Sequence, residues 1–268
     1  MPQMPNLNIS KTPLIRCLHN MKRRLIQLKE IDSTNRYIAE LTANADEMVI
    51  VTADEQTNGR GQGTNKWESE PGKNLLFSLL LHPSYLSVHN QFLLTMAGSL
   101  AVKKALDTYT TGICIKWPND IYHKDSKISG TLIETHLSGN HIKDFIFGTG
   151  INLNQYIFKS DAPNPVSLCT LIGRETPPNE VLDKVLSAFE KYNDMLQKGN
   201  HEEVVTPYHA ALYRAQGFYL YKDKHGIFEA EIVQVATDGH LVLRDRNGYT
   251  RRYAFKEVTY VFENLSTH

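Results

Sequence analysis

The sequence predicts an α+β fold in which a mixed, largely antiparallel sheet carries helices and is followed by a small β-barrel. Apolar strand-like segments alternate with helical spacing between residues 25 and 216. Several segments follow one another through short connections, which favours antiparallel pairing. From about Gly217 only short strand-like segments separated by turn signals occur. We therefore expect a weakly structured leader over residues 1–24, a main domain over 25–216 and a barrel over 217–268.

The first elements alternate between strands and a short helix. Residues 25–31 (LIQLKEI) are typical of a strand, and Asp32 or Ser33 is suited to cap a helix directly after it. That helix would bury one face formed by Tyr37, Ile38 and Leu41. Strands are predicted at EMVIVTADEQ (47–56) and at NLLFSLLLHP, where Pro83 ends the pattern.

Two longer helices and three strands complete the main domain. Helical spacing from Phe92 to Leu106 predicts a long amphipathic helix. The segments GICIKW, KISGTLIETHL and DFIFGTGINLN follow as strands. A second helix is predicted from Asn179, as its N-cap, to about Gly199, with a buried face of Val181, Leu182, Val185, Leu186, Phe189 and Tyr192.

The tail contains two pairs of turn residues. Asp238–Gly239 and Asn247–Gly248 each separate strand-like segments with alternating apolar residues. Both pairs predict primed hairpin turns, in which both central residues have positive φ.

The composition excludes several functional classes. The 29 basic and 29 acidic residues balance, so there is no electrostatic basis for nucleic-acid binding. Cys17, Cys114 and Cys169 form no C-x-x-C pair, and neither H-E-x-x-H nor G-x-S-x-G occurs. The longest apolar run, LLFSLLL, is too short to cross a bilayer, and no secretory signal is visible. We expect a cytoplasmic protein that binds neither nucleic acid nor membranes.

The segment TNGRGQGTNKW (57–67) combines three glycines with Arg60 and Trp67. Glycine lets backbone N–H groups approach an anion closely, and a guanidinium suits a carboxylate or phosphate. Trp67 offers a face for a planar ring. Two interpretations are open: a mobile flap that folds over a charged ligand, or a solvated loop beside a core tryptophan. The glycine spacing is not that of a dinucleotide-binding loop.

Polar residues also collect in the segment KWPNDIYHKDSKISGTLIE. Pro118 ends a strand, so Asn119 and Asp120 lie in a turn. Asp120 is either a magnesium or lysine partner or a residue that only stabilises the turn. Lys127 begins the next strand, in which Gly130 indicates that another group comes close.

In FGTGINLN, two further glycines lie in a strand before two asparagines. Asn152 and Asn154 alternate with apolar residues, so their amides would face the same side. They either read the edge of a base or form a polar sheet face.

Together, the four segments IDSTNRYI, ADEQTNGRGQGTNKW, KWPNDIY…KISGTLIE and GTGINLN resemble the biotin–protein ligases in order and spacing. The resemblance extends from about Leu25 to the C-terminus. It implies a catalytic domain like that of class II aminoacyl-tRNA synthetases and an SH3-like β-barrel. Some bacterial members have an N-terminal helix-turn-helix domain. Only about two dozen residues precede the catalytic region here, so we expect no DNA-binding role.

The resemblance implies a two-step reaction that uses biotin, ATP and Mg²⁺. The biotin carboxylate attacks the α-phosphate of ATP to give biotinyl-5′-AMP and pyrophosphate. A lysine of a biotin carboxyl carrier domain of a carboxylase then attacks the mixed anhydride to form an amide. The oligomeric state stays open between a monomer and a homodimer.

The resemblance also implies roles for individual residues. It assigns catalysis to Lys127, Arg60 and Asp120, and it assigns the metal to Asp120. The resemblance assigns biotin binding to Ser33, Thr34, Asn35, Gln56, Gly59, Arg60, Gly61, Lys127 and Gly130. Nucleotide binding falls to Arg60, Gln62, Trp67, Asn119, Lys127 and Asn152.

One departure and three rival functions are relevant. Many members have the loop G-R-G-R-x-G-R-x-W, whereas Gln62 and Asn65 stand at the later arginine positions here. The loop therefore carries less positive charge, and how firmly it retains the adenylate stays open. A lipoate or octanoate ligase shares the fold, but the GRG loop and the terminal barrel favour biotin. A non-catalytic biotin sensor would not need Lys127, Arg60 and Asp120 together. A nucleotide-binding regulator would bind ATP without biotin-dependent turnover.

Overall fold

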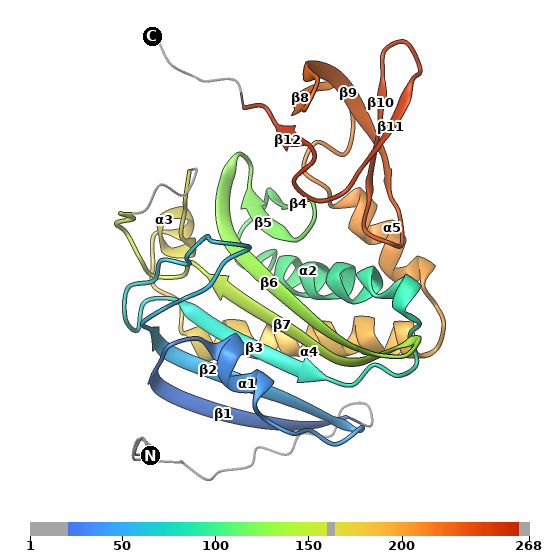
Figure 1. Cartoon of the computed structure of the whole chain (residues 1–268). Coiled ribbons are helices and arrows are strands. Elements are labelled where there is room, and N and C mark those ends of the chain that lie inside the picture. The colour runs from blue at the N-terminus through green and yellow to red at the C-terminus, as the bar shows by residue number, and fades with distance from the viewer. Residues whose placement is uncertain (1–20, 160–163, 263–268) are drawn as a thin grey trace. The chain divides into compact units, whose positions relative to one another are not determined.

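The computed structural model describes residues 21–159 and 164–262 (Figure 1). They form two compact units. The first comprises residues up to Tyr85 and Lys127–Asp183, and the second comprises Leu86–Ser126 and the chain from Lys184. This division differs from the expected boundary after residue 216, which stays a prediction. Most of the expected leader lies outside the described residues, but residues 22–24 are already part of a strand.

Five strands of the first unit lie side by side. Their order is β1 (Lys22–Ile31), β2 (Glu47–Gln56), β3 (Leu75–Leu81), β7 (His141–Ile151) and β6 (Ser126–Ser138). Strands β1 and β2 are parallel, and the other neighbours are antiparallel. The mixed, largely antiparallel sheet is therefore confirmed. The short β6–β7 connection explains their antiparallel pairing.

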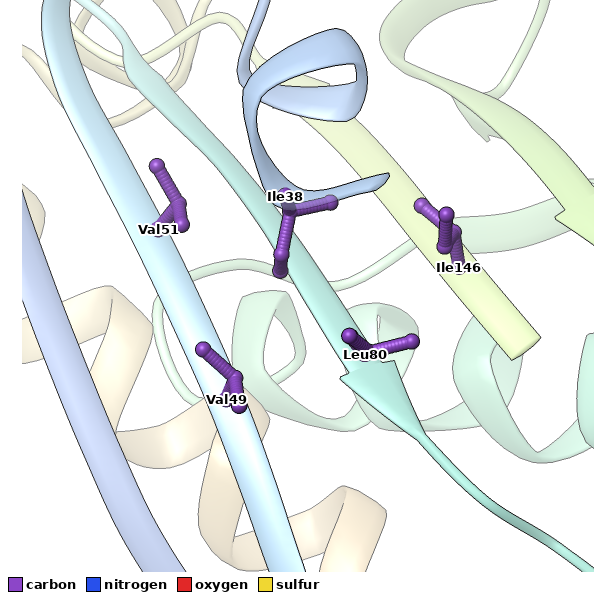
Figure 2. Close-up of a cluster of buried hydrophobic side chains, with 5 residues drawn as sticks. All are labelled: Ile38, Val49, Val51, Leu80 and Ile146. Atoms are coloured by element: carbon purple, nitrogen blue, oxygen red, sulfur yellow. The ribbon is translucent and has the colours of Figure 1, made fainter. Parts of the chain in front are cut away.

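Helix α1 (Thr34–Ala39) lies on one face of this sheet. Its Ile38 contacts a buried cluster on β2, β3 and β7, formed by Val49, Val51, Leu80 and Ile146 (Figure 2). Ser33 occupies the N-cap position as predicted, but its side chain makes no capping hydrogen bond. Instead, the Ser33 N–H donates to Asp32 Oδ1 at 2.7 Å. Ile38 thus fixes the helix that carries Thr34 and Asn35.

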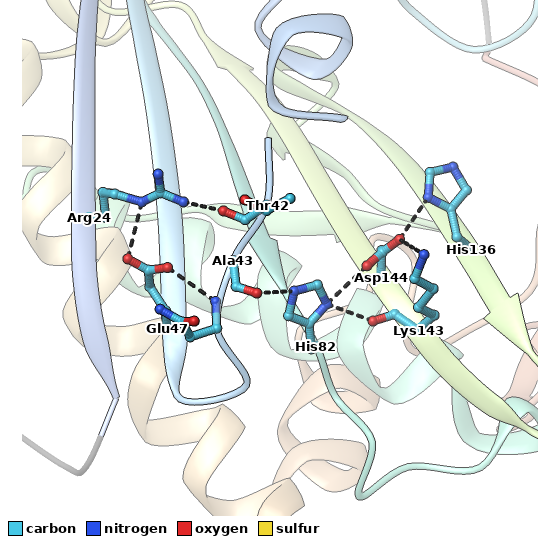
Figure 3. Close-up of polar contacts among 9 residues, drawn as sticks. Arg24, Thr42, Ala43, Glu47, His82, His136, Lys143 and Asp144 are labelled. Atoms are coloured by element: carbon cyan, nitrogen blue, oxygen red, sulfur yellow. Dashed lines mark hydrogen bonds and ion pairs between the residues drawn. The ribbon is translucent and has the colours of Figure 1, made fainter. Parts of the chain in front are cut away.

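Polar contacts hold the loop between α1 and β2 (Figure 3). Arg24 of β1 donates to the Thr42 carbonyl and pairs with Glu47 at 3.1 Å. His82, directly after β3, contacts the Ala43 carbonyl through Nε2 at 3.1 Å and Asp144 through Nδ1 at 2.9 Å. These contacts connect the loop to β1, β3 and β7.

Helices α3 (Leu168–Ile172) and α4 (Pro178–Gln197) follow β7. Helix α4 begins with Pro178, which suits the first helical position because no N–H is needed there. Asn179 therefore lies inside the first turn, and its prediction as the N-cap is wrong. The predicted buried face is confirmed from Val181 to Phe189, and Tyr192 is half-buried.

The second unit contains η1 (Val88–Asn90), α2 (Phe92–Leu106) and α5 (Glu202–Ala210). Helix α2 was predicted as amphipathic, but it is buried around nearly its whole circumference, including Thr95 and Ser99. The unit also has a hairpin of β4 (Ile113–Lys116) and β5 (Asp120–His123). Strand β5 was not predicted because DIYH is too short for a clear alternation.

A separate antiparallel sheet ends the described chain. It contains β8 (Tyr219–Asp223), β9 (Gly226–Val235), β10 (Leu241–Asp245), β11 (Thr250–Tyr253) and β12 (Thr259–Tyr260) in the order β11-β10-β9-β8-β12. Its closure into a barrel stays a prediction. Among the described residues, no helix is long and apolar enough to cross a bilayer.

The predicted primed turns in this sheet are wrong. Gly239 and Gly248 have φ of +91° and +83°, but Asp238 and Asn247 do not have positive φ. The Gly239 N–H donates to the Ala236 carbonyl at 2.8 Å, and the Ala236 N–H donates to the His240 carbonyl at 2.9 Å. This pattern is typical of a type I turn followed by one left-handed glycine. An aspartate or asparagine before glycine is compatible with either turn.

Candidate active site

The sheet face that carries α1 lacks side chains in one region. Gly150 of β7 lies opposite Gly130 of β6, and Gly148 lies next along the same face. On the adjacent strand β3, Leu76 pairs with Gly150 and Ser78 pairs with Gly148. Since alternate residues share a face, Ile146 beneath α1 shows that these glycines lie on the α1 side. The glycines thus form a bare floor.

Trp67 covers part of this floor. A Cβ on Gly150 would lie 2.3 Å from Trp67 Nε1, and one on Gly130 would lie 2.7 Å from Trp67 Cζ3. Any larger residue at either position would displace the indole. Trp67 Nε1 is buried without a hydrogen-bond partner in the described part of the chain. The glycines are therefore required by the close approach of the ring, and the indole keeps a donor available.

The glycine loop is folded back on itself like a small hairpin. The Gly61 N–H donates to the Asn65 carbonyl at 2.8 Å, and the Trp67 N–H donates to the Gly59 carbonyl at 3.0 Å. A Cβ on Gly59 would lie 2.7 Å from the Trp67 carbonyl oxygen, so this crossing also requires glycine. Gln62 lies near the tip, where its carbonyl accepts from the Asn65 N–H. The mobility of the loop stays a prediction.

Lys127 reaches the same floor. Its Cε lies 3.2 Å from the position that a Cβ on Gly130 would occupy. Its backbone is fixed on both sides, because its N–H donates to the Asn164 carbonyl and its carbonyl accepts from the Val166 N–H, both at 2.9 Å. The structure thus brings Trp67, Gly130 and Lys127 together, and their roles in ligand binding stay predictions.

A row of hydrogen-bonding side chains lies beside the floor. Gln56 Oε1 accepts from the Thr34 N–H at 2.8 Å and from Thr34 Oγ1 at 3.0 Å. Ser78 Oγ lies 2.8 Å from Thr34 Oγ1 and 2.6 Å from Asn35 Oδ1. A Cβ on Gly148 would lie 1.7 Å from Asn35 Oδ1, so this glycine makes room for Asn35. Ser33, at the start of α1, is also buried.

Glu134 connects this polar row to the glycine loop. Its Oε1 lies 3.1 Å from Arg60 Nη2, and its Oε2 accepts from Asn35 Nδ2 at 2.9 Å. The two partners of the ion pair are 39% and 31% exposed, so water screens their attraction. The contact nevertheless directs the guanidinium towards the α1 face.

Asn152 follows β7 at the edge of this region. Its Nδ2 donates to the Val166 carbonyl at 3.2 Å, whereas its buried Oδ1 has no partner among the residues described. Asn154 is engaged differently, because its amide exchanges two hydrogen bonds with the Thr176 backbone. Asn152 therefore keeps an acceptor for a ligand, and Asn154 fixes the loop.

Asn119 and Asp120 belong to the second unit. Asn119 ends the turn between β4 and β5, and Asp120 begins β5, where it pairs in register with Lys116. Asn119 is buried, and Asp120 is half-buried. The predicted position in a turn is confirmed for Asn119 and is wrong for Asp120, which is the first residue of β5.

The acidic residues suit a metal ion that binds together with a phosphate ligand. They suit a permanently bound metal ion less well. In the described ranges, no group of three or more His, Cys, Asp or Glu side chains could hold a metal. Mg²⁺ typically uses one or two carboxylates, several waters and substrate phosphates. A single carboxylate at Asp120 fits that pattern.

Sequence reasoning missed two members of the site. Ser78 lies inside the apolar run LLFSLLL, where a buried hydroxyl needs a partner. Glu134 shares a strand face with Gly130 by alternation, so its position could have been predicted. Its contact with Arg60 could not have been predicted, because the two residues are far apart in the sequence.

Comparison with known proteins gives consistent matches. The Biotin/lipoate A/B protein ligase family matches residues 28–152. The bifunctional ligase/repressor BirA of Bacillus spizizenii is 34% identical over 188 residues, which cover 67% of this chain and 57% of that protein. The matched part thus spans less than two thirds of that relative's length.

Two further relatives are matched over most of their length. The biotin–[acetyl-CoA-carboxylase] ligase of Paracoccus denitrificans is 28% identical, over 82% of this chain and 94% of that protein. The structure of the biotin protein ligase from Aquifex aeolicus in complex with biotin and ATP aligns with a TM-score of 0.73 at 27% identity. The alignment covers 88% of this chain and 97% of the Aquifex aeolicus chain.

Proposed function

This chain belongs, through residues 28–152, to the Biotin/lipoate A/B protein ligase family, and we propose that it ligates biotin to a lysine of a biotin carboxyl carrier domain. ATP drives the reaction through biotinyl-5′-AMP. The main support is the gathering of Trp67 and Lys127 over the bare floor at Gly130 and Gly150, beside a buried row of hydrogen-bonding side chains. This arrangement suits an organic anion with a polar head.

The polar row accepts the ureido ring of biotin. That ring offers one carbonyl acceptor and two N–H donors. Ser33, Thr34, Asn35 and Gln56 provide hydroxyl and amide groups of both kinds. The apolar chain of biotin then lies over the part of the glycine floor at Gly130 and Gly150, beside the Trp67 indole and the Lys127 side chain.

The first step forms a bond between a biotin carboxylate oxygen and the α-phosphorus of ATP. The bond from that phosphorus to the pyrophosphate oxygen breaks. Two anions must approach each other, so their repulsion raises the barrier. Arg60 and Lys127 place positive charge where negative charge develops, and such preorganised charge is often the largest single contribution to catalysis.

The glycine loop and Asn152 hold the nucleotide. Trp67 packs against the adenine ring, and Asn152 Oδ1 accepts a hydrogen bond from the amino group of the adenine. The loop at Gly59 and Gly61 closes over the anions and excludes water from a hydrolysable anhydride. Asn119 and Asp120 bind the phosphate end, where Mg²⁺ neutralises phosphate charge when bound.

In the second step, the carrier lysine amine attacks the acyl carbon of biotinyl-5′-AMP. The bond to the AMP oxygen breaks, and the nitrogen loses a proton as the amide forms. We place this reaction in the cytoplasm, where ATP and newly made carrier domains are found.

The test is a mass spectrum of the carrier domain. The protein is mixed with Mg·ATP, a biotin carboxyl carrier domain, and either biotin or lipoate. We expect a mass shift with biotin only, which Lys127→Ala abolishes. Lys29→Ala, an exposed lysine on β1, is the matched control and should retain the shift.

Each other result assigns a different function. A shift with lipoate only would move the chain to the lipoate ligases of the same family. No shift with either acid, together with tight biotin binding, would indicate a sensor and contradict the proposed enzyme.

A further inference from the structure

The turn that ends at Asn119, directly before Asp120, is short and mostly buried. Lys116 pairs with Asp120 across the β4–β5 hairpin, so Trp117, Pro118 and Asn119 form its three-residue loop. Trp117 is 4% exposed and Asn119 is 7% exposed. A loop of this length has few internal hydrogen bonds, so its shape depends on contacts from other elements of the same unit.

The first contact comes from α5. The Tyr208 hydroxyl donates a hydrogen bond to the Pro118 carbonyl at 2.8 Å. Tyr208 is completely buried, and burial raises the pKa of its hydroxyl, which therefore stays protonated as a donor. The Pro118 carbonyl belongs to the peptide unit that joins Pro118 to Asn119. Tyr208 thus fixes the backbone from which the Asn119 side chain starts.

The second contact comes from the C-terminal sheet. Trp117 Nε1 donates to the Gly239 carbonyl in the β9–β10 turn at 2.9 Å. Gly239 has φ of +91°, and a Cβ there would lie 2.7 Å from Phe92. The ring of Phe92 in turn meets Tyr208 edge-on, with centroids 6.1 Å apart. The two contacts on the loop are therefore part of one packed cluster.

We propose that Tyr208 and Trp117 are positioning residues that hold Asn119 and Asp120 in the geometry needed for Mg·ATP. Neither side chain needs to touch the nucleotide, because both act on the loop itself. The C-terminal sheet thereby takes part in nucleotide binding through the Gly239 carbonyl. This inference rests on the proposed function, in which Asn119 and Asp120 bind the phosphate end.

Two variants remove one hydrogen bond each and keep an aromatic ring. Tyr208→Phe deletes the hydroxyl, and Trp117→Phe deletes the indole donor. Tyr253→Phe is the matched control, since its partly buried hydroxyl donates to Asp223 at 2.7 Å in another part of the unit. We expect KM for Mg·ATP to rise roughly fivefold in each test variant, as expected for one lost hydrogen bond. KM for biotin should stay unchanged in all three.

A second measurement separates positioning from stability and from the reaction itself. Binding of Mg²⁺ with a non-hydrolysable ATP analogue is measured by calorimetry, and thermal unfolding is measured for every variant. Support would be weaker analogue binding in the two test variants at a melting temperature equal to that of Tyr253→Phe. An unchanged affinity, or an equal loss in Tyr253→Phe, would overturn the proposal.

The proposed function and this inference fail in different ways. An inactive wild-type chain contradicts the ligase function, while the analogue affinities still decide the role of Tyr208 and Trp117. An active wild-type chain with unaltered Mg·ATP kinetics in both variants contradicts only the positioning role.

Discussion

Gly150 is the residue on which the position of Trp67 depends most directly. A Cβ there would lie 2.3 Å from the indole, which is inside any real contact distance. We predict that Gly150→Ala lowers the ligation rate roughly tenfold or more, because an overpacked site must move the ring. The measurement is the initial rate of biotin transfer to the carrier domain.

Gly139→Ala is the control for this prediction. Gly139 has φ of +58° with open space around its Cβ position, so alanine there strains the backbone without touching a ring. It should lower stability slightly and leave the rate unchanged. An active Gly150→Ala would show that the indole moves away freely.

Glu134 determines where Arg60 points before a ligand arrives. We predict that Glu134→Gln makes the loop more sensitive to trypsin in the absence of ligand. The amide oxygen of glutamine can still accept from Asn35, but the charge that attracts Arg60 is lost. The ion pair is partly exposed, so the effect should be at most about 1 kcal/mol and should weaken with added salt.

The trypsin experiment follows cleavage after Arg60 and Lys66 over time. Glu229→Gln, which removes the partner of Arg246 in the second unit, is the control and should leave cleavage unchanged. Equal cleavage of wild type and Glu134→Gln at low salt would contradict a role for this contact.

Single residues differed in how readily the sequence drew attention to them. Gly130 is recognised because a glycine weakens a strand unless another group comes close, whereas Lys127 is singled out by the family resemblance alone. The sequence could not predict that Asn152 Oδ1 lacks a hydrogen-bond partner. This depends on the Val166 carbonyl, which accepts a hydrogen bond from Asn152 Nδ2. Such choices are made by the packing of distant segments.

Helix α1 is the element that joins the hydrophobic core to the polar row. Ile38 lies in the cluster with Val49 and Leu80, and Thr34 and Asn35 lie on the same helix. We predict that Ile38→Ala lowers the free energy of unfolding by about 2–5 kcal/mol, the usual range for a buried isoleucine. It should also raise KM for biotin, because the helix then shifts.

Urea unfolding and biotin kinetics test this prediction together. Ile157→Ala, at a position that is 70% exposed, is the control and should change neither quantity. A destabilised Ile38→Ala with an unchanged KM for biotin would show that α1 keeps its position without Ile38.

Element boundaries were predicted well where a buried pattern was long and poorly where turns decided the structure. Strand β2 has the predicted limits because its apolar run is bounded by polar residues on both sides. The turn at Asp238–Gly239 differs because dihedral angles depend on the twist of the flanking strands, which include an irregularity between Val242 and Leu243. Residue identity alone does not specify that twist.

For the whole molecule, we predict a loss of stability in alkaline solution to which Cys114 contributes. Burial raises the pKa of its thiol from an ordinary value of 9.0 to about 11. The unfolded chain loses this proton first, so the contribution to stability is complete below pH 9 and is lost as the pH rises towards 11. Burial also raises the pKa of Tyr213 to about 12, which extends the loss to higher pH.

Urea midpoints of wild type and Cys114→Ala, measured in reducing buffer from neutral to strongly alkaline pH, test this contribution. The tyrosines are present in both proteins, so the difference between the two curves isolates the thiol. We expect the stability of the variant to fall less steeply above pH 9. Parallel curves would show that the thiol ionises equally in both states.

The tip of the β6–β7 hairpin offers a practical point of attachment for biosensor design. Residues 138–141 are exposed, and Gly139 has open space around it. The tip lies eight residues along β6 from Gly130, which corresponds to about 27 Å of extended strand. A fluorophore, or a short linker to a chip surface, can therefore be inserted there while the glycine floor stays accessible to small molecules.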